Sequence, residues 1–192
     1  MNESRGTLTR AVAAGRILDA ALEELVRQGA GSLAMHEVAE RAGVSKGLIH
    51  YHFHDKNALL AEIAERLGER ITARARRALS GSSTATAIKD LEHWLASELE
   101  IGEWRGLLAL SEWPADEVQR AAAAALDARR DEVRLVLDRL FALLHIQTKM
   151  SLSPLVDLTV ATVNGLAVER ESGRDPTHAL DALVMAFYRL SD

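Results

Sequence analysis

The 192-residue chain has no cysteine, three prolines and eight aromatic residues. Without cysteine it can form neither a disulfide framework nor a cysteine-ligated zinc site. It also lacks an apolar run of the roughly 18 to 20 residues that cross a bilayer, and its first residues lack the apolar core of a signal peptide. The polar–apolar alternation of strands is missing as well. We therefore expect an all-α, cytoplasmic protein that makes no membrane contact.

Positive charge is unevenly distributed along the chain. Residues 1–80 hold 12 Lys and Arg against 10 Asp and Glu, a net charge of +2, whereas residues 81–192 hold 11 against 18, a net charge of −7. An acidic protein can bind nucleic acid when its positive charge is gathered on one module, because phosphates respond to the local field. Solvated helix faces produce such a split by chance too, so the split alone identifies no partner.

Residues 35–53 carry the most informative pattern. Apolar residues from Met35 to Ala42 recur at i, i+3, i+4 and i+7, which predicts a short helix with one buried face. Gly43 suits the C-terminus of that helix, and the hydroxyl of Ser45 can cap a second helix. Two helices joined by such a turn form a helix-turn-helix, whose second helix enters the major groove of DNA.

Residues 38–53, followed by residues 55–60, resemble the N-terminal signature of the tetracycline-repressor (TetR) family, roughly I-A-x-x-A-G-V-S-x-G-x-[LIF]-Y-x-H-F and then S-K-E-x-L. The resemblance covers about the first third of the chain. It implies a three-helix helix-turn-helix DNA-binding domain over residues 1–55 and a long connecting helix over residues 55–79. A larger helical effector-binding and dimerisation domain is implied over residues 80–192.

The resemblance also implies a function, that of a homodimeric repressor which a small-molecule effector releases from a palindromic double-stranded DNA operator. The main alternative is a helical protein-interaction module on the same fold that does not bind DNA sequence-specifically. We expect no enzyme activity and no cofactor. The sequence contains no nucleophile elbow and no phosphate-cradling Gly-rich loop, and the spacing of its carboxylates singles out no catalytic pair.

The family pattern assigns DNA contacts to the second helix and its surroundings. Lys46 is expected to donate to a base, Gly47 to permit close approach of the backbone, and Lys56 to contact a phosphate. Two departures stand out: Leu33 and Ala34 replace a capping Thr or Ser, so we expect Ser32 to take over the cap. The implied DNA-binding residues are Ser32, Ser45, Lys46, Gly47, Leu48, His50, Tyr51, His52 and Lys56.

Three histidines, His50, His52 and His54, alternate with other residues and raise the question of a metal site. On a helix only His50 and His54 can share a face, and no third ligand is evident. We therefore predict no metal site.

The three tryptophans lie within one window of twenty residues. Binding cavities are lined mostly by apolar and aromatic side chains with a few polar ones, so we expect an effector site there, although ordinary core packing explains tryptophans equally well. Acidic residues nearby, among them Glu98 and Glu103, hint at a cationic effector. The candidate effector-binding residues are His93, Trp94, Glu98, Trp104, Trp113, His145 and Met150.

The last two helical stretches of the chain are apolar. In the family the final two helices pair with those of a second subunit, although a hairpin packed on its own body shows the same periodicity. The candidate dimer-interface residues are Leu155, Leu158, Thr162, Leu166, Leu180, Leu183, Val184 and Phe187.

Overall fold

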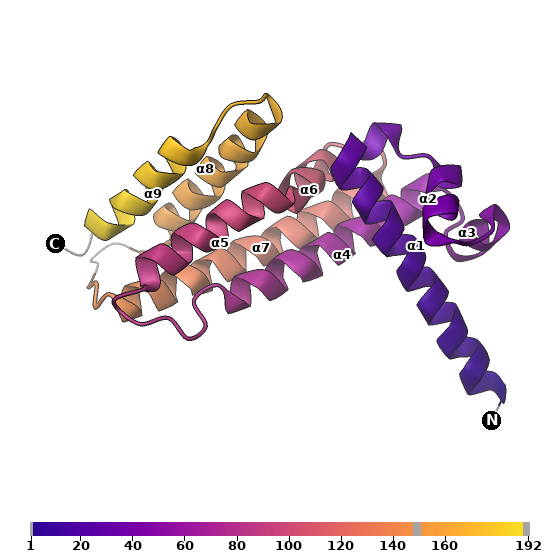
Figure 1. The fold of residues 1–192 in the computed structure, drawn as a ribbon, viewed down its shortest axis with the longest axis horizontal. Helices are drawn as coiled ribbons and strands as arrows, with labels where there is room; N and C mark the ends of the chain where they lie inside the picture. Colours follow the sequence, from indigo (N-terminus) through magenta and orange to yellow (C-terminus); the bar gives the residue numbers. More distant parts are fainter. Residues whose placement is uncertain (1, 148–150, 190–192) are drawn as a thin grey trace. The chain divides into compact units, whose positions relative to one another are not determined.

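The computed structural model describes residues 2–147 and 151–189, and every regular element in them is an α-helix (Figure 1). This confirms the predicted all-α fold. No helix in this part of the chain is long and apolar enough to span a membrane. In chain order the helices are α1 (Asn2–Ser32), α2 (Met35–Ala42), α3 (Lys46–His52), α4 (Lys56–Arg77), α5 (Ala87–Ile101), α6 (Glu103–Ser111), α7 (Asp116–Leu143), α8 (Ser153–Glu171) and α9 (Thr177–Arg189).

The described residues divide into two compact units. The first unit falls within Met1–Leu67 and Gly106–Ala124, and the second within Gly68–Arg105 and Ala125–Asp192, so that α4, α6 and α7 contribute to both. This division differs from the expected one, because residues 106–124 join the N-terminal unit. A Cβ at position 106 would lie 2.6 Å from a methyl carbon of Leu25, so the missing side chain allows α6 to pack closely on α1.

The first unit is built on an apolar core shared by its N-terminal helices. Ile17 and Leu25 from α1, Val38 from α2 and Ile49 from α3 are buried, and α1 contacts both α2 and α3. Phe53, which directly follows α3, is buried as well. Ile49 and Phe53 therefore belong to the core of this unit.

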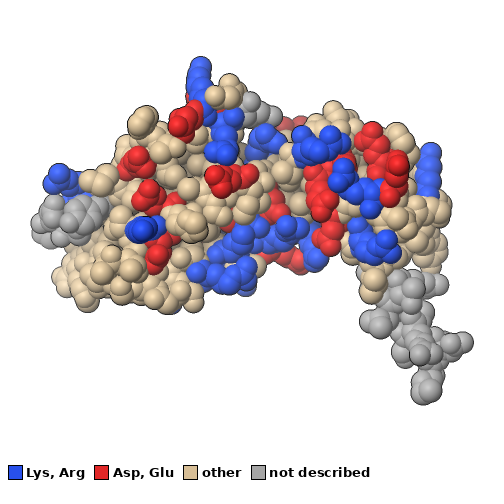
Figure 2. All heavy atoms as spheres, viewed as in Figure 1, with Lys and Arg blue, Asp and Glu red and all other residues tan. Residues whose placement is uncertain are grey.

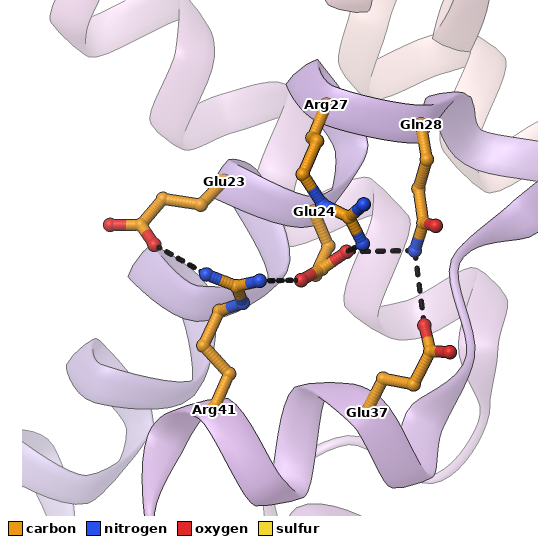
Figure 3. Close-up of polar contacts among 6 residues, drawn as sticks. All are labelled: Glu23, Glu24, Arg27, Gln28, Glu37 and Arg41. Carbon is orange, nitrogen blue, oxygen red and sulfur yellow. Dashed lines mark hydrogen bonds and ion pairs between the residues drawn. The ribbon is translucent and has the colours of Figure 1, made fainter.

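A buried carboxylate joins α1 to α2 (Figure 3). Glu24 is 2% exposed; its Oε2 accepts from Arg27 at 2.5 Å and from Gln28 at 2.8 Å, and its Oε1 forms an ion pair with Arg41 of α2. The same amide of Gln28 also donates to Glu37 of α2, at 3.1 Å. The hydrogen bond from Arg27 in particular, together with that from Arg41, lowers the pKa of Glu24 although burial opposes the shift. Both oxygens of this buried carboxylate are thus satisfied, as buried charge requires.

In the second unit α5 contacts the antiparallel pair α8 and α9, which lie side by side in Figure 1. The C-terminal half of α4 approaches α7 closely at one glycine. A Cβ added to Gly68 would come within 2.7 Å of the Cβ of Ala125. Leu95 of α5 and Leu140 of α7 are fully buried in this unit.

Five of the eight residues expected at a dimer interface are buried within the single chain. Leu166, Leu180, Leu183, Val184 and Phe187 are each at most 7% exposed. Their apolar periodicity reflects packing inside the second unit, and their assignment to a subunit interface stays a prediction. The periodicity identified the buried face of each helix but not what covers it.

The other three interface candidates keep some accessibility. Leu158 is 53% exposed, while Leu155 and Thr162 are half-buried. Two large apolar residues that the sequence did not single out, Val168 of α8 and Met185 of α9, are about as exposed as Leu158.

Candidate DNA-binding surface and effector cavity

The turn between α2 and α3 has the predicted geometry. Gly43 adopts a left-handed conformation with φ 62° and ψ 40°, which a residue with a side chain rarely takes. The backbone N–H of Val44 donates to Ala39 at 3.0 Å, and the amide of Leu48 donates to Ser45 Oγ at 3.2 Å. Both the glycine C-cap and the Ser45 N-cap are thereby confirmed.

The start of α2 differs from the expectation. Its N-cap residue is Ala34, which makes no side-chain capping bond, while Ser32 is the last residue of α1. The expectation that Ser32 caps α2 is therefore wrong. The acidic residue Glu37 lies in the first turn of α2, where a negative charge favours the helix dipole.

The outer face of α3 is open to solvent. Ser45, Lys46, Gly47 and His50 are exposed, and Tyr51 is 57% exposed. A Cβ on Gly47 would meet only Ser45 Oγ, at 3.9 Å, so nothing within the chain requires a glycine at this position. A glycine at position 47 would instead allow the backbone of a binding partner to approach α3 closely.

Leu48 and His52 are only half-buried, which sets them apart from the exposed members of the predicted DNA-contact set. The ring of His52 lies edge-on to Tyr51 with centroids 5.3 Å apart and also contacts Phe53. Its Nε2 is buried and has no hydrogen-bond partner among the described residues. The ring therefore packs at the edge of the first unit's core more than it projects outward.

Lys56 and Trp113 form a contact that sequence reasoning missed. The ammonium of Lys56 donates to the carbonyl of Gly31 at 3.2 Å and lies 5.1 Å from the centre of the Trp113 ring. The indole N–H of Trp113 donates to Asn57 at 2.9 Å. Burial lowers the pKa of Lys56. Trp113 thus packs on the start of α4 in the first unit and does not line the cavity described below, so its assignment to the effector site stays a prediction.

The second unit contains a cavity of about 390 Å³ at the end of α4 and the start of α5. His93, Trp94 and Glu98 line it together, as three members of the predicted effector set. Arg74, Arg77 and Asp90 line it as well and were not predicted. Figure 2 shows Lys and Arg side chains gathered over the C-terminal half of α4, where the sequence places Arg70, Arg74, Arg76 and Arg77.

Two buried carboxylates of the second unit, Glu98 and Glu103, are paired with arginines of α4. Glu98 and Glu103 are each 1% exposed. Arg74 donates to both oxygens of Glu98, at 2.5 and 2.8 Å, and its third nitrogen lies 2.6 Å from Glu103. Arg70 Nε completes the set at 2.9 Å from Glu103. Glu98 and Glu103, two of the acidic residues that hinted at a cationic effector, are therefore already paired with arginines of the chain itself.

Trp104 and Arg129 lie next to Trp94. The rings of Trp94 and Trp104 meet edge to face with centroids 6.0 Å apart, and the guanidinium carbon of Arg129 lies 4.5 Å from the centre of the Trp104 ring. Burial lowers the pKa of Arg129 to about 10, although Glu98 opposes the shift. Arg129 therefore remains charged at neutral pH.

The remaining effector candidates do not join this group. His145 is exposed just beyond the end of α7, with φ 56°, and does not line the cavity, so its assignment stays a prediction. Met150 lies outside the described residues. Within the described ranges no three His, Asp or Glu side chains are grouped as metal ligands would be.

These features define an all-helical protein with an exposed helix-turn-helix in one unit and a polar cavity in the other. Residues 17–63 match the model described as "Bacterial regulatory proteins, tetR family", which places this segment of the chain in that family. The transcriptional regulator AcrR of Shigella flexneri is 47% identical over 49 residues, which are 26% of this chain and 23% of AcrR. The match thus spans about a quarter of each protein.

Solved structures resemble this chain over nearly its whole length. A structure described as a TetR-family transcriptional regulator from Rhodococcus sp. is 25% identical with a TM-score of 0.74, covering 95% of this chain and 100% of that one. The TetR-like regulator LfrR from Mycobacterium smegmatis, solved in complex with proflavine, is 20% identical with a TM-score of 0.68 and covers 94% and 96%. The second likeness shows the fold alone.

Proposed function

We propose that the chain is a cytoplasmic, DNA-binding transcriptional regulator, most simply a repressor, that responds to a small molecule. The exposed outer face of α3, with an unobstructed Gly47 beside Lys46, is the observation that carries this function. AcrR, which is 47% identical over 49 residues, is named as a transcriptional regulator, and this favours DNA binding over the protein-interaction module. Lys46 at the N-terminal end of α3 suits donation to guanine O6 or N7.

The regulator is proposed to act as a homodimer on a palindromic operator. One recognition helix reads few bases, so two are needed for selectivity, and they must reach half-sites about 34 to 36 Å apart. Leu155, Leu158 and Thr162 of α8, together with Val168 and Met185, offer accessible surface for the second subunit. A two-fold contact uses the same patch on both subunits.

Release is proposed to follow from linkage between the effector and DNA. A ligand shifts an equilibrium only by its differential affinity for the two conformations, and here it would favour the one that binds operator poorly. The continuous helices α4, α6 and α7 each contribute to both compact units, which makes them the proposed carriers of the coupling. The LfrR complex supports this role, since it shows a protein of this fold holding a small organic molecule.

Electrophoretic mobility shifts with the DNA that flanks the chain's own gene test the proposal. We expect sequence-selective binding that weakens as salt rises, because phosphate contacts release counterions. Lys46→Ala should relax base preference, whereas Lys56→Ala should weaken all sequences alike and lower the salt slope by about 1. Lys89→Ala is the matched control, since Lys89 is an exposed lysine of the second unit.

Two results would count against the proposal. One is the absence of any selective, salt-sensitive shift with these fragments. The other is a Lys89→Ala variant that loses binding as fully as Lys46→Ala, which would show that lysine charge in general, and not the outer face of α3, supports binding.

A further inference from the structure

The second unit contains a group of buried hydrogen-bond donors without acceptors. The indole nitrogens of Trp94 and Trp104, and Nε and Nη1 of Arg129, are buried and have no hydrogen-bond partner within the described residues. All four atoms are N–H donors. The three side chains touch one another through the ring contacts of Trp104. Buried polar groups are almost always paired in folded proteins, so four unpaired donors in one place need a cause.

Arg129 is the central member of the group. It is 1% exposed, and its one hydrogen bond, from Nη2, goes to the neutral side chain of Asn164 at 2.5 Å. The face of Trp104 attracts the cation but gives Nε and Nη1 no acceptor. A buried guanidinium normally has a carboxylate or phosphate partner.

The neighbouring charges do not neutralise Arg129. The buried carboxylates Glu98, Glu103 and Glu132 of this unit lie within ion-pair distance of Arg74, Arg70 and Arg76, respectively. Each of these carboxylates thus has an arginine partner other than Arg129, which leaves the positive charge of Arg129 unmatched. A monoanion would match this excess, whereas a cationic ligand would increase it.

The donors adjoin the cavity through Trp94, which lines it together with Glu98. An incoming oxyanion would meet N–H donors at Trp94, Trp104 and Arg129, while the indole rings supply apolar surface for the rest of the molecule. A carboxylate suits this donor set better than a doubly charged phosphate, because only one positive charge is unmatched.

We propose that the effector is an organic monocarboxylate, whose carboxylate is bound by Arg129 with the indole N–H groups of Trp94 and Trp104. The inference rests on the proposed function in taking this cavity as the effector site. It replaces the cationic ligand that the acidic residues of the sequence suggested.

Isothermal titration calorimetry on the full chain at pH 7.5 tests the inference with benzoate, hexanoate and octanoate. Each is compared with its primary amide, which has nearly the same shape but no charge. We expect at least one carboxylate to bind, and its amide to bind at least tenfold more weakly, because hydrogen bonds to charged groups are the stronger ones. If no member of the panel binds, or if acid and amide bind equally, the inference is wrong.

Arg129→Gln separates the proposed contact from general packing. We expect it to weaken carboxylate binding by about tenfold to a hundredfold and to leave amide binding unchanged. Arg130→Gln is the matched control, since Arg130 is the next residue on α7 and pairs with Asp157 on the surface. Arg129→Lys keeps the positive charge and should recover part of the affinity. Equal losses in the Arg129→Gln and Arg130→Gln variants would contradict the assignment.

The calorimetric test of ligand binding and the mobility-shift test of DNA binding can fail independently. A selective DNA shift without carboxylate binding would overturn the ligand class and leave the regulator proposal intact. Carboxylate binding with the Arg129 dependence, but without any DNA shift, would support the ligand class and count against the regulator.

Discussion

The two units differ in how completely a buried charged side chain is hydrogen-bonded. In the first unit Glu24 accepts from Arg27, Arg41 and Gln28, so that both of its oxygens are used. In the second unit Arg129 has one neutral partner, and two of its three nitrogens are unpaired within the described residues. The cluster around Glu24 is saturated, because all its charged groups have hydrogen-bond partners; it stabilises the contact between helices and leaves no group for a ligand. Arg129 keeps unpaired donors that can bind a ligand, at a cost in stability.

The largest change in stability is expected when the Glu24 cluster is removed. Glu24→Ala should lower the free energy of unfolding by about 2 to 3 kcal/mol, because it removes the acceptor that joins α1 to α2. The two arginines regain water, since both are partly exposed, and this limits the loss. Urea denaturation measures it. Glu23→Ala is the control, as Glu23 is exposed and pairs with Arg41 at only 3.5 Å; a similar loss there would show that the cluster has no special role.

Arg129→Met should change stability in the opposite direction. Replacing a buried, incompletely paired charge by an apolar side chain of similar length is often neutral or stabilising. We expect a gain of about 1 kcal/mol without ligand, reduced by the acceptor of Asn164 that loses its partner. Thermal and urea unfolding of the ligand-free protein check this. A loss of more than about 2 kcal/mol would mean that Arg129 serves the fold, and the contrast with Glu24 would disappear.

The smallest effect is the pH dependence of the saturated cluster. The folded-state pKa of Glu24 is lowered, so its ionisation contributes stability that is fully present above the unfolded-state value near 4.5 and is lost as pH falls through the folded value. The stability difference between the wild type and Glu24→Gln should therefore be constant from pH 7 to about 5 and then shrink on further acidification. A difference that grew with acid would reverse the sign assigned to Glu24.

The local features of the helix-turn-helix could be predicted from the sequence. Gly43, Ser45 and the buried Ile49 follow from rules that span only a few residues, namely a left-handed C-cap, a hydroxyl N-cap and helical periodicity. The predicted cap of α2 by Ser32 was wrong, because α1 resumes after the non-helical Gly29 and includes Ser32 as its last residue.

Features that depend on distant partners could not be predicted in this way. Trp113 lies close to Trp104 in the sequence, yet its indole bonds to Asn57, 56 residues away. Leu180 and Phe187 showed the periodicity of a buried face, which is the same whether the chain or a second subunit covers it.

Arg129 was missed although a signal for it existed. It falls on the buried stripe of α7 that also contains Val118, Ala122, Ala125 and Val136, at spacings of three, four and seven residues. A charged residue is normally assigned to the solvent face. A charge that interrupts an apolar stripe is thus a useful marker of a polar site inside a helical unit.

The open space around Gly47 has a consequence for how this protein tolerates variation. Since a side chain there meets only Ser45 Oγ at 3.9 Å, and alanine is favoured over glycine in helices by up to about 1 kcal/mol, substitution should leave folding intact or improve it. In a saturation library, position 47 would then combine normal cellular abundance with lost gene control. Under the proposed function, a substitution at this position would therefore alter DNA binding without destabilising the fold.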